Sequence, residues 1–260
     1  MGGFGIVVPA YQPNVERLAT YVETLDRTVA PDVIRVEVDA PEPETVDELS
    51  DLPAEVSIAA ERRGKGTAIT AGFEALETDI VGFVDADGST PAASVATVLA
   101  PVADGEVDLA VGSRRHPDAN VESHQTYARR WLGDGFAWLA RRLLTVSLYD
   151  YQCGAKVMTN ESWEAVRSHL YERGFAWDVE LVAMAGALDQ RVAEVPVSWE
   201  DQPGSTVSPV GTTIELFRAL MVVRHRAKLL ADHPLHSMID ARREPPVALI
   251  DRVAAEETDD

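Results

Sequence analysis

The sequence predicts an α/β fold in which helices cover both faces of a mostly parallel sheet. In its first half, short apolar runs alternate with stretches whose apolar residues recur every three or four positions. Short apolar runs are typical of buried strands, and the other spacing is typical of one helix face. Alternation of this kind builds a parallel sheet. The length of 260 residues is enough for one large domain with a substantial core.

Five strands and three helices are expected in this first half. The strands are apolar runs at residues 6–8, 33–38, 56–59, 80–84 and 109–111. The first helix has one apolar face, formed by Val15, Leu18, Val22, Leu25 and Val29. The second helix is expected at residues 65–76, and the third is marked by Val95, Val98, Leu99 and Val102.

The second half of the sequence is less regular. A helix is predicted by the apolar spacing of Leu132, Phe136, Leu139 and Leu143. A late strand is expected at residues 192–197 and a long helix at residues 212–230. We expect residues 1–230 to form a single domain, and residues 231–260 to form a polar, acidic and partly ordered tail.

Charge restricts the class of protein. The formal net charge is −20, and the acidic residues are dispersed along the chain, which is typical of a solvated acidic surface. This charge disfavours general nucleic-acid binding, so no nucleic-acid partner is expected. It also hints at a halophilic source, because a high-salt cytoplasm screens the self-repulsion.

Three features of the sequence indicate a cytoplasmic protein. Cys153 is the only cysteine, so no internal disulfide can form, as is usual in a reducing cytosol. The first apolar run has no basic segment before it and does not read as a signal peptide. No apolar run approaches the length that spans a bilayer, so a contact with a membrane would be peripheral.

The strongest functional signal is an apolar strand that ends in two carboxylates, Asp85 and Asp87. Alternate residues of an extended segment point the same way, so both can face one site. Carboxylate oxygens suit Mg²⁺ or Mn²⁺ that carries a diphosphate, and ligands of open α/β sheets bind at the carboxyl ends of strands. A polar turn after a strand explains the motif equally well when it is taken alone.

A second signal lies at the expected start of the second helix, where the sequence reads Arg62-Arg63-Gly64-Lys65-Gly66-Thr67. Paired glycines allow the backbone to approach a ligand closely, and a helix N-terminus attracts phosphate. The segment is not a P-loop, because Ala59 stands where that motif needs a glycine. Taken alone, it is better interpreted as a glycine-rich turn with solvated basic side chains.

Several motifs occur in an order that is typical of one enzyme family. They are Val8-Pro9-Ala10-Tyr11, Gly64-Lys65-Gly66-Thr67-Ala68 with Gly72-Phe73, Asp85-Ala86-Asp87-Gly88-Ser89, Val111-Gly112-Ser113-Arg114, Asp150-Tyr151-Gln152-Cys153-Gly154-Ala155-Lys156, Phe175-Ala176-Trp177-Asp178-Val179-Glu180-Leu181 and Val195-Pro196-Val197-Ser198-Trp199. Each motif is weak alone, but together they cover roughly residues 4–230 in a specific order. On these motifs the chain resembles the family 2 glycosyltransferases, and within them the polyprenyl-phosphate (dolichyl-phosphate) hexose synthases.

The resemblance implies a single GT-A domain, which is Rossmann-like and binds a nucleotide. It implies a metal-dependent, inverting transfer of a hexose from a nucleotide sugar to polyprenyl or dolichyl phosphate, with Mg²⁺ or Mn²⁺ as cofactor. Residues 150–156 are similar to the glucose-type enzymes, which favours a UDP-hexose donor over GDP-mannose. The lipid acceptor implies a peripheral position on the inner face of the cell membrane.

The resemblance also assigns roles by position. Contacts to the nucleotide sugar would come from Pro9, Ala10, Tyr11, Asp39, Lys65, Gly66, Asp85, Ala86 and Asp87. Of these, Asp85 and Asp87 would hold the metal. The acceptor phosphate would be bound mainly by Arg114, with weaker contributions from Arg129 and Arg130. The sugar or acceptor pocket would include Gln152, Lys156, Trp177 and Trp199. The catalytic residues would be Asp87, Arg114, Asp178 and Glu180.

The acceptor decides whether a base is needed. A phosphate monoester has a second pKa of about 6, so it is largely ionised at neutral pH and needs little help from a general base. A hydroxyl acceptor would need one, and Asp178 or Glu180 is then the candidate. An anionic acceptor of a chain with net charge −20 needs local cations instead, which Arg114 and its neighbours supply.

One departure from the family and two alternative functions remain. The family has an Asp-Asp-Gly-Ser turn after its second strand, whereas residues 37–41 retain only Asp39, which leaves the identity of the nucleotide open.

A sugar-nucleotide nucleotidyltransferase would use similar loops and acids and release pyrophosphate. A non-catalytic nucleotide-sugar-binding protein would bind the donor without turnover. The intact Asp-Ala-Asp motif favours the glycosyltransferase.

Overall fold

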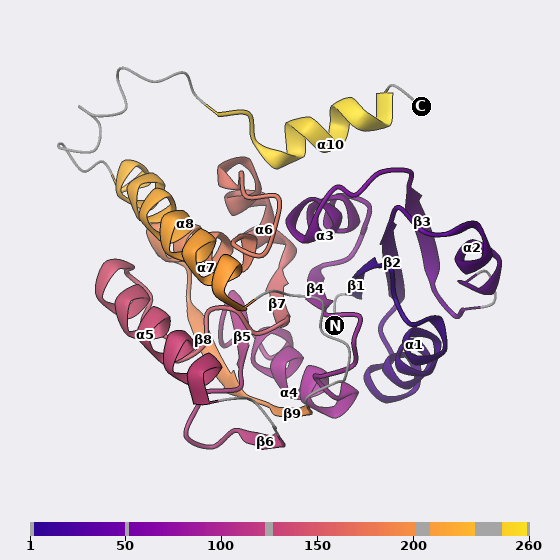
Figure 1. Ribbon diagram of the computed structural model, residues 1–260, viewed down its shortest axis with the longest axis horizontal. Coiled ribbons are helices and arrows are strands. Elements are labelled where there is room, and N and C mark those ends of the chain that lie inside the picture. The colour runs from indigo at the N-terminus through magenta and orange to yellow at the C-terminus, as the bar shows by residue number, and fades with distance from the viewer. Residues whose placement is uncertain (1–2, 50–51, 123–126, 201–208, 232–245, 259–260) are drawn as a thin grey trace.

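The computed structural model describes residues 3–49, 52–122, 127–200, 209–231 and 246–258, which form a seven-stranded sheet covered by helices (Figure 1). The strands of this sheet are β1 (Phe4–Tyr11), β2 (Val33–Asp39), β3 (Glu55–Ala59), β4 (Ile80–Val84), β5 (Leu109–Ser113), β7 (Ala155–Thr159) and β8 (Val192–Pro196). Their spatial order is β3-β2-β1-β4-β7-β5-β8. Two short strands, β6 (Asn120–Glu122) and β9 (Ser198–Glu200), form a separate parallel pair.

The sheet is parallel except at β7, which runs antiparallel to both β4 and β5. The expected mixed, mostly parallel sheet is therefore confirmed. The sequence did not predict β7, because Lys156 interrupts its apolar run. The reversal has a consequence for the site, since the amino end of β7 lies beside the carboxyl ends of its two neighbours.

Helices cover both faces of the sheet (Figure 1). They are α1 (Val15–Val29), α2 (Pro43–Leu49), α3 (Lys65–Glu74), α4 (Ala92–Ala103), α5 (Tyr127–Leu143), α6 (Asn160–Val166), a short 3-10 turn (Arg167–His169), α7 (Trp177–Ala187), α8 (Pro209–Leu230) and α10 (Leu249–Thr258). Alternate residues of β1 enter two separate cores. Ile6 and Val8 pack with α1 and α4, whereas Val7 packs with α3, α7 and α8.

The expected C-terminal tail contains a helix that packs on the domain. In α10, Leu249 and Val253 are buried, and the backbone N–H of Leu249 donates to the carbonyl of Leu170 at 2.8 Å. Their spacing of four residues is a helical signal that the polar composition of this segment obscures. Within the described residues, no helix combines the length and the apolar character that crossing a membrane requires.

Candidate active site

The predicted site residues meet at one edge of the sheet. Tyr11, at the end of β1, is paired in register with Asp39, at the end of β2. Beside them, Val84 at the end of β4 is paired with Ala155, the first residue of β7. The motif before β7 is therefore brought to the carboxyl ends of the parallel strands, which is the ligand-binding edge of an open α/β sheet.

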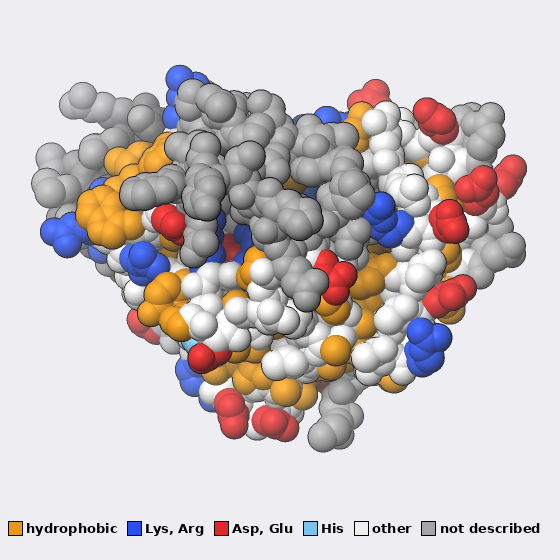
Figure 2. Space-filling view, turned by 60° about the horizontal axis from the view of Figure 1, so that its bottom comes forward, with side chains coloured by type: hydrophobic (Ala, Val, Ile, Leu, Met, Phe, Trp, Pro, Cys, Tyr) orange, Lys and Arg blue, Asp and Glu red, His pale blue; other side chains and the backbone are white. Residues whose placement is uncertain are grey.

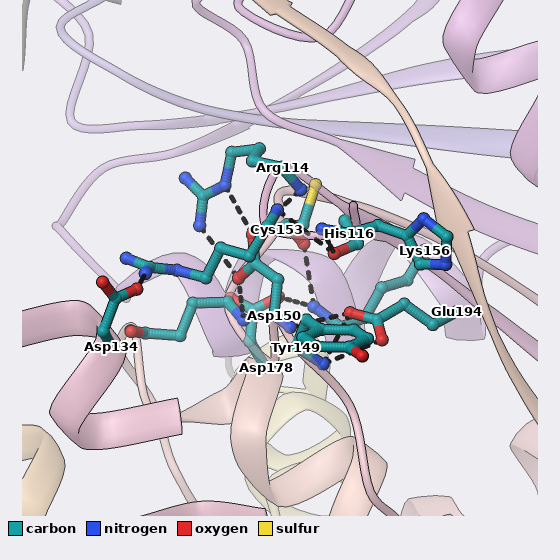
Figure 3. Close-up of polar contacts among 12 residues, drawn as sticks. Arg114, His116, Asp134, Tyr149, Asp150, Cys153, Lys156, Asp178 and Glu194 are labelled. Atoms are coloured by element: carbon teal, nitrogen blue, oxygen red, sulfur yellow. Dashed lines mark hydrogen bonds and ion pairs between the residues drawn. The ribbon is translucent and has the colours of Figure 1, made fainter. Parts of the chain in front are cut away.

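Four charged side chains form a chain of alternating sign at this edge. The ammonium of Lys65 lies 2.8 Å from Asp85 Oδ1 and 2.9 Å from Asp178 Oδ2. The ammonium of Lys156 donates to Asp178 Oδ1 at 2.6 Å and to the carbonyl of Cys153 at 2.8 Å (Figure 3). Both Lys156 and Asp178 are about 1% exposed, so each buried charge is neutralised by its neighbour.

This pairing fixes the protonation of the buried groups. Burial raises the pKa of Asp178, but Lys156 and Lys65 outweigh that effect and hold it below the ordinary value. Burial lowers the pKa of Lys65, and here Asp178 and Asp85 reverse the direction. A carboxylate with both oxygens bound and a lowered pKa is a poor proton acceptor. The geometry therefore favours a positioning role for Asp178 over the role of base.

Asp85 and Asp87 follow β4, as expected, and their surroundings fit a divalent cation. Lys65 already places a positive charge on Asp85. A Cβ atom at Gly154 would lie 1.9 Å from Asp85 Oδ2, so this glycine leaves the space that the carboxylate uses. Burial and the charge of Asp85 raise the pKa of Asp87, so a cation between the two would be favourable. No cluster of three His, Cys, Asp or Glu side chains suited to a metal occurs among the described residues, so other ligands would come from the diphosphate or water.

Gly64, which precedes α3, and Gly66, in the first turn of α3, serve packing rather than an approach to phosphate. The backbone N–H groups of Gly66 and Thr67 both donate to the carbonyl of Arg173, at 2.8 and 3.4 Å. A Cβ atom at Gly66 would lie 2.4 Å from the carbonyl oxygen of Glu172. The expected use of this helix N-terminus for phosphate is therefore not supported at these two groups. What the segment presents to the site is the side chain of Lys65.

Asp39 holds the same loop from the other side. Its Oδ1 accepts from Arg63 Nε at 2.8 Å, and its Oδ2 accepts from the backbone N–H of Gly64 at 2.9 Å. Arg63 also reaches the fully buried Glu37, at 2.8 Å. Both oxygens of Asp39 are thus engaged within the protein, whereas Tyr11 is exposed and carries a guanidinium 4.1 Å above its ring centroid, that of Arg62.

Arg114 is bound to a carboxylate of its own chain. Its Nε and Nη2 donate to the two oxygens of Asp150, at 2.7 and 3.1 Å (Figure 3). Glu194 fixes the loop that carries Asp150 by accepting its backbone N–H at 2.7 Å. Although burial raises the pKa of Asp150, Arg114 outweighs it and lowers that pKa to about 2. Two-point binding of an acceptor phosphate by Arg114 therefore does not fit this arrangement.

Two other predicted residues lie away from the charged chain. Trp177 is fully buried, with its ring centroid 5.5 Å from that of Phe83. It therefore packs in the core behind the site and lines no open pocket. Glu180 is also fully buried and faces elsewhere. It accepts from the backbone N–H groups of Tyr171 and Glu172, at 2.7 and 2.8 Å, and pairs with Arg226 at 2.5 Å. These contacts give Glu180 a structural role.

The remaining predicted residues are distributed around the edge. Gln152 and Trp199 are half-buried, and the guanidinium of Arg114 lies 5.7 Å from the ring centroid of Trp199. Arg129 and Arg130 belong to α5, but their side chains lie outside the described part of the structure. Burial raises the pKa of Cys153 to about 12, which agrees with its interpretation as a packed residue and not a nucleophile.

Glu37, Arg63 and Asp150 organise the site although no role is predicted for them from the sequence. Asp150 begins the motif of residues 150–156, and Arg63 lies two positions before Lys65. Their roles depend on partners that are distant in sequence, so only the fold reveals them.

The chain is similar in sequence and fold to known glycosyltransferases. The family model of glycosyl transferase family 2 matches residues 6–163. The chain is 31% identical over 217 residues to Glycosyltransferase AglD of Haloferax volcanii, covering 79% of this chain and 34% of that protein. It is 31% identical over 169 residues to the dolichyl-phosphate beta-glucosyltransferase of Mus musculus, covering 63% of this chain and 52% of the relative. The chain thus spans about a third to a half of these relatives.

Solved structures show the same fold. Glucosyl-3-phosphoglycerate synthase from Mycobacterium tuberculosis, in complex with Mn²⁺, UDP-glucose and phosphoglyceric acid, superposes with a TM-score of 0.65 at 16% identity. The match covers 86% of this chain and 80% of that one. The expected GT-A fold is therefore confirmed.

Proposed function

The chain belongs to glycosyl transferase family 2, and we propose that it transfers a hexose from a nucleotide-diphosphate sugar to a polyprenyl phosphate, such as dolichyl phosphate. The observation that carries the proposal is the edge where Asp85 and Asp87 lie beside the ammonium of Lys65. Two carboxylates and a fixed cation are what a metal-bound diphosphate leaving group requires. The names of the curated relatives supply the substrate class.

Asp85 and Asp87 are the residues that would hold Mg²⁺ or Mn²⁺. When bound there, the ion supplies positive charge that stabilises the departing nucleoside diphosphate. Lys65 adds a second positive charge at the same place, and Asp178 with Lys156 keeps that ammonium in position. Pro9, Ala10 and Tyr11 would contact the nucleotide, because they end β1 at this edge.

The acceptor oxygen would attack the anomeric carbon from the face opposite the nucleotide and invert it. An ionised phosphate suits this site better than a hydroxyl, because both carboxylates considered as bases are already bound. Asp178 is held by two lysines, and Glu180 is held by Arg226 and two backbone N–H groups. A phosphate monoester has already lost its proton at neutral pH and needs neither of them.

The proposed contact of Arg114 with the acceptor phosphate is reduced to a single hydrogen-bond donor. Nε and Nη2 of Arg114 are committed to Asp150, which leaves Nη1 for a single-point contact beside Trp199. Because the Arg114–Asp150 pair is neutral as a whole, long-range attraction of the phosphate would depend on other cations. Arg129 and Arg130 at the start of α5 remain candidates for that role.

The donor is proposed to be a UDP-hexose. The relatives named as beta-glucosyltransferases favour a glucose-type donor, in agreement with residues 150–156. Asp39 would act on the nucleotide indirectly, by holding the loop that carries Lys65, because both of its oxygens are engaged.

The decisive experiment incubates the purified protein with polyprenyl phosphate, Mg²⁺ or Mn²⁺, and a panel of UDP- and GDP-hexoses. Formation of glycolipid from a UDP-hexose is expected. Release of pyrophosphate from a sugar phosphate and a nucleoside triphosphate would support a nucleotidyltransferase instead. Donor binding without turnover on any acceptor would support a binding protein. Efficient transfer to an uncharged alcohol would contradict the ionised acceptor.

A peripheral contact with the inner face of the cell membrane is proposed at α5 and α8. Trp138 on α5 and Met221 on α8 are 61% and 53% exposed, and the two helices pack through Phe136 and Phe217. Figure 2 shows apolar side chains bordered by lysine and arginine side chains on the side of the molecule where Figure 1 places these helices. Exposed apolar side chains next to basic ones suit an anionic lipid surface.

Vesicle flotation tests this surface. The protein should float with anionic vesicles, and a Trp138→Ala, Met221→Ser variant should float less. Val247→Ser is the matched control, because Val247 is 53% exposed but lies beside α10. Absence of the protein from the vesicle fraction at both low and high salt would contradict a lipid contact here. Leu220 and Val223 are buried, so their side of α8 packs in the core.

A further inference from the structure

We infer that Lys65 makes metal binding depend on the nucleotide, by holding Asp85 as its counter-ion until a diphosphate arrives. The inference rests on the proposed function, in which Asp85 and Asp87 hold Mg²⁺ or Mn²⁺.

Several contacts hold the ammonium of Lys65 in one position. Its ammonium lies 2.8 Å from Asp85 Oδ1 and 2.9 Å from Asp178 Oδ2, and 5.1 Å from the ring centroid of Phe83. Its side chain is only 10% exposed, so water screens these contacts weakly. Asp178 cannot turn away, because Lys156 holds its other oxygen at 2.6 Å. The ammonium therefore stays beside Asp85 for as long as no other anion competes for it.

This ammonium opposes a metal ion that arrives alone. A divalent cation on Asp85 and Asp87 would share one carboxylate with the ammonium and lie within a few ångströms of it. Like charges at such a separation repel strongly in a partly buried site. The ion would also have to replace a salt bridge that already neutralises Asp85.

A diphosphate removes this opposition. Its oxygens bind the metal ion and can accept the hydrogen bonds of the ammonium, so Lys65 changes from a competitor of the metal into a partner of the complex. Metal and nucleotide then strengthen each other's binding, and by linkage the factor is the same in both directions. Lys65 is thereby a positioning residue whose charge sets the size of this coupling.

Titration of Mn²⁺ followed by electron paramagnetic resonance tests the inference, because the signal of free Mn²⁺ reports binding without any turnover. In the wild type, Mn²⁺ alone should bind weakly, and UDP or GDP should strengthen its binding markedly. Lys65→Gln should bind Mn²⁺ alone more tightly, on the order of tenfold, and the nucleotide should add less. Lys65→Arg keeps the charge and should resemble the wild type.

Arg62→Gln is the matched control, since it also removes one positive charge. Arg62 is three residues before Lys65 in the sequence, and its guanidinium lies over the ring of Tyr11. It should leave the affinity for Mn²⁺ alone nearly unchanged. Circular dichroism of each variant verifies that it is folded, and a misfolded Lys65→Gln is replaced by Lys65→Met. An unchanged or weaker affinity of the neutral variant for Mn²⁺ alone would overturn the inference. A wild type that binds no Mn²⁺ even with nucleotide would instead overturn the proposed metal site.

Discussion

The carboxylates of the site differ in what each of them contacts. Asp178 and Asp150 are buried, and lysine or arginine side chains of the same protein neutralise their charge. Asp87 accepts the backbone N–H of Ser89 at 2.9 Å but forms no ion pair among the described residues, and partial burial together with the charge of Asp85 raises its pKa. Its charge is therefore the one most available to an external cation.

Replacement of Asp87 by alanine should reduce turnover by about a hundredfold or more, because charge on the leaving group would lose its stabilisation. Chelation with EDTA should silence the wild type to a similar extent. The measurement is glycolipid formation under saturating donor, with circular dichroism to verify the fold. Glu23→Ala, an exposed acid on α1, is the control and should keep full activity. Full activity in excess EDTA would contradict the metal.

The Arg114–Asp150 pair predicts a pH dependence of stability. Asp150 has a pKa of about 2 in the folded protein, below the value of 3.8 for an unperturbed aspartate. A carboxyl group whose pKa is lower in the folded than in the unfolded protein stabilises the folded state at any pH above its unfolded-state pKa. This contribution is lost as the pH falls from about 4 to about 2. Asp150→Asn should therefore cost about 2 kcal/mol of unfolding free energy at pH 7. The cost should shrink as the pH falls through this range.

Urea unfolding of both proteins between pH 7 and pH 3 measures this difference. Asp26→Asn, at an exposed position on α1, is the control and should follow the wild type throughout. A difference for Asp150→Asn that stays constant over the whole range would refute the assignment.

At the scale of elements, strands were easier to predict than buried helices. The apolar runs gave β1 to β5 because each is short and bounded by polar turns. Helix α7 lacks a polar face, since Trp177 to Ala185 are all buried, and so it carries no amphipathic period to detect. β7 was missed because a buried lysine, Lys156, interrupts its apolar run, and the partners that stabilise this ammonium, Asp178 and the carbonyl of Cys153, are recognised only in the fold.

The pairings within the site could not be predicted. The motifs could be found in the sequence because each has a typical order of residue types. Lys65 and Asp178, however, are 113 positions apart, and Arg114 and Asp150 are 36 apart. Their contacts depend on the order of the strands and on the reversal at β7, which sequence periodicity does not specify.

Helix α10 is expected to support the donor site from a distance. It anchors Leu170, and the same loop places the carbonyl of Arg173 on the N–H groups that begin α3. Val253→Asp should undock α10 and cost about 2–4 kcal/mol of stability, because it buries an unpaired charge or frees the helix. The loosened loop should raise the KM for the donor more than it lowers kcat.

Ala254→Asp is the matched control, since it adds the same carboxylate at the exposed neighbouring position. Steady-state kinetics with the donor varied, together with urea unfolding, separates the two effects. A Val253→Asp variant that loses stability but keeps the donor KM would show that α10 has no part in positioning the Lys65 loop.

At the scale of the whole molecule, the acidic charge sets the conditions for stability. The net charge of −20 is spread over the chain, and Figure 2 shows acidic side chains scattered over one face. Dispersed like charges repel each other in the compact state more than in the unfolded chain. Salt reduces this repulsion, since the screening length falls from about 10 Å at 0.1 M to about 3 Å at 1 M.

Raising KCl from 0.1 M to 1 M should therefore stabilise the fold. Relief of about 1 kcal/mol would raise Tm by roughly 2–4 °C in a domain of this size. Calorimetric or fluorescence melting at constant pH measures the shift. General salting-out of apolar surface also raises Tm, so variants must separate the two causes. Neutralising the exposed acids Glu23, Asp26 and Glu106 to their amides should reduce the slope of Tm against salt. Arg27→Gln, which removes an exposed positive charge, should increase it. Equal slopes in all three proteins would assign the salt effect to salting-out and contradict the role of surface charge.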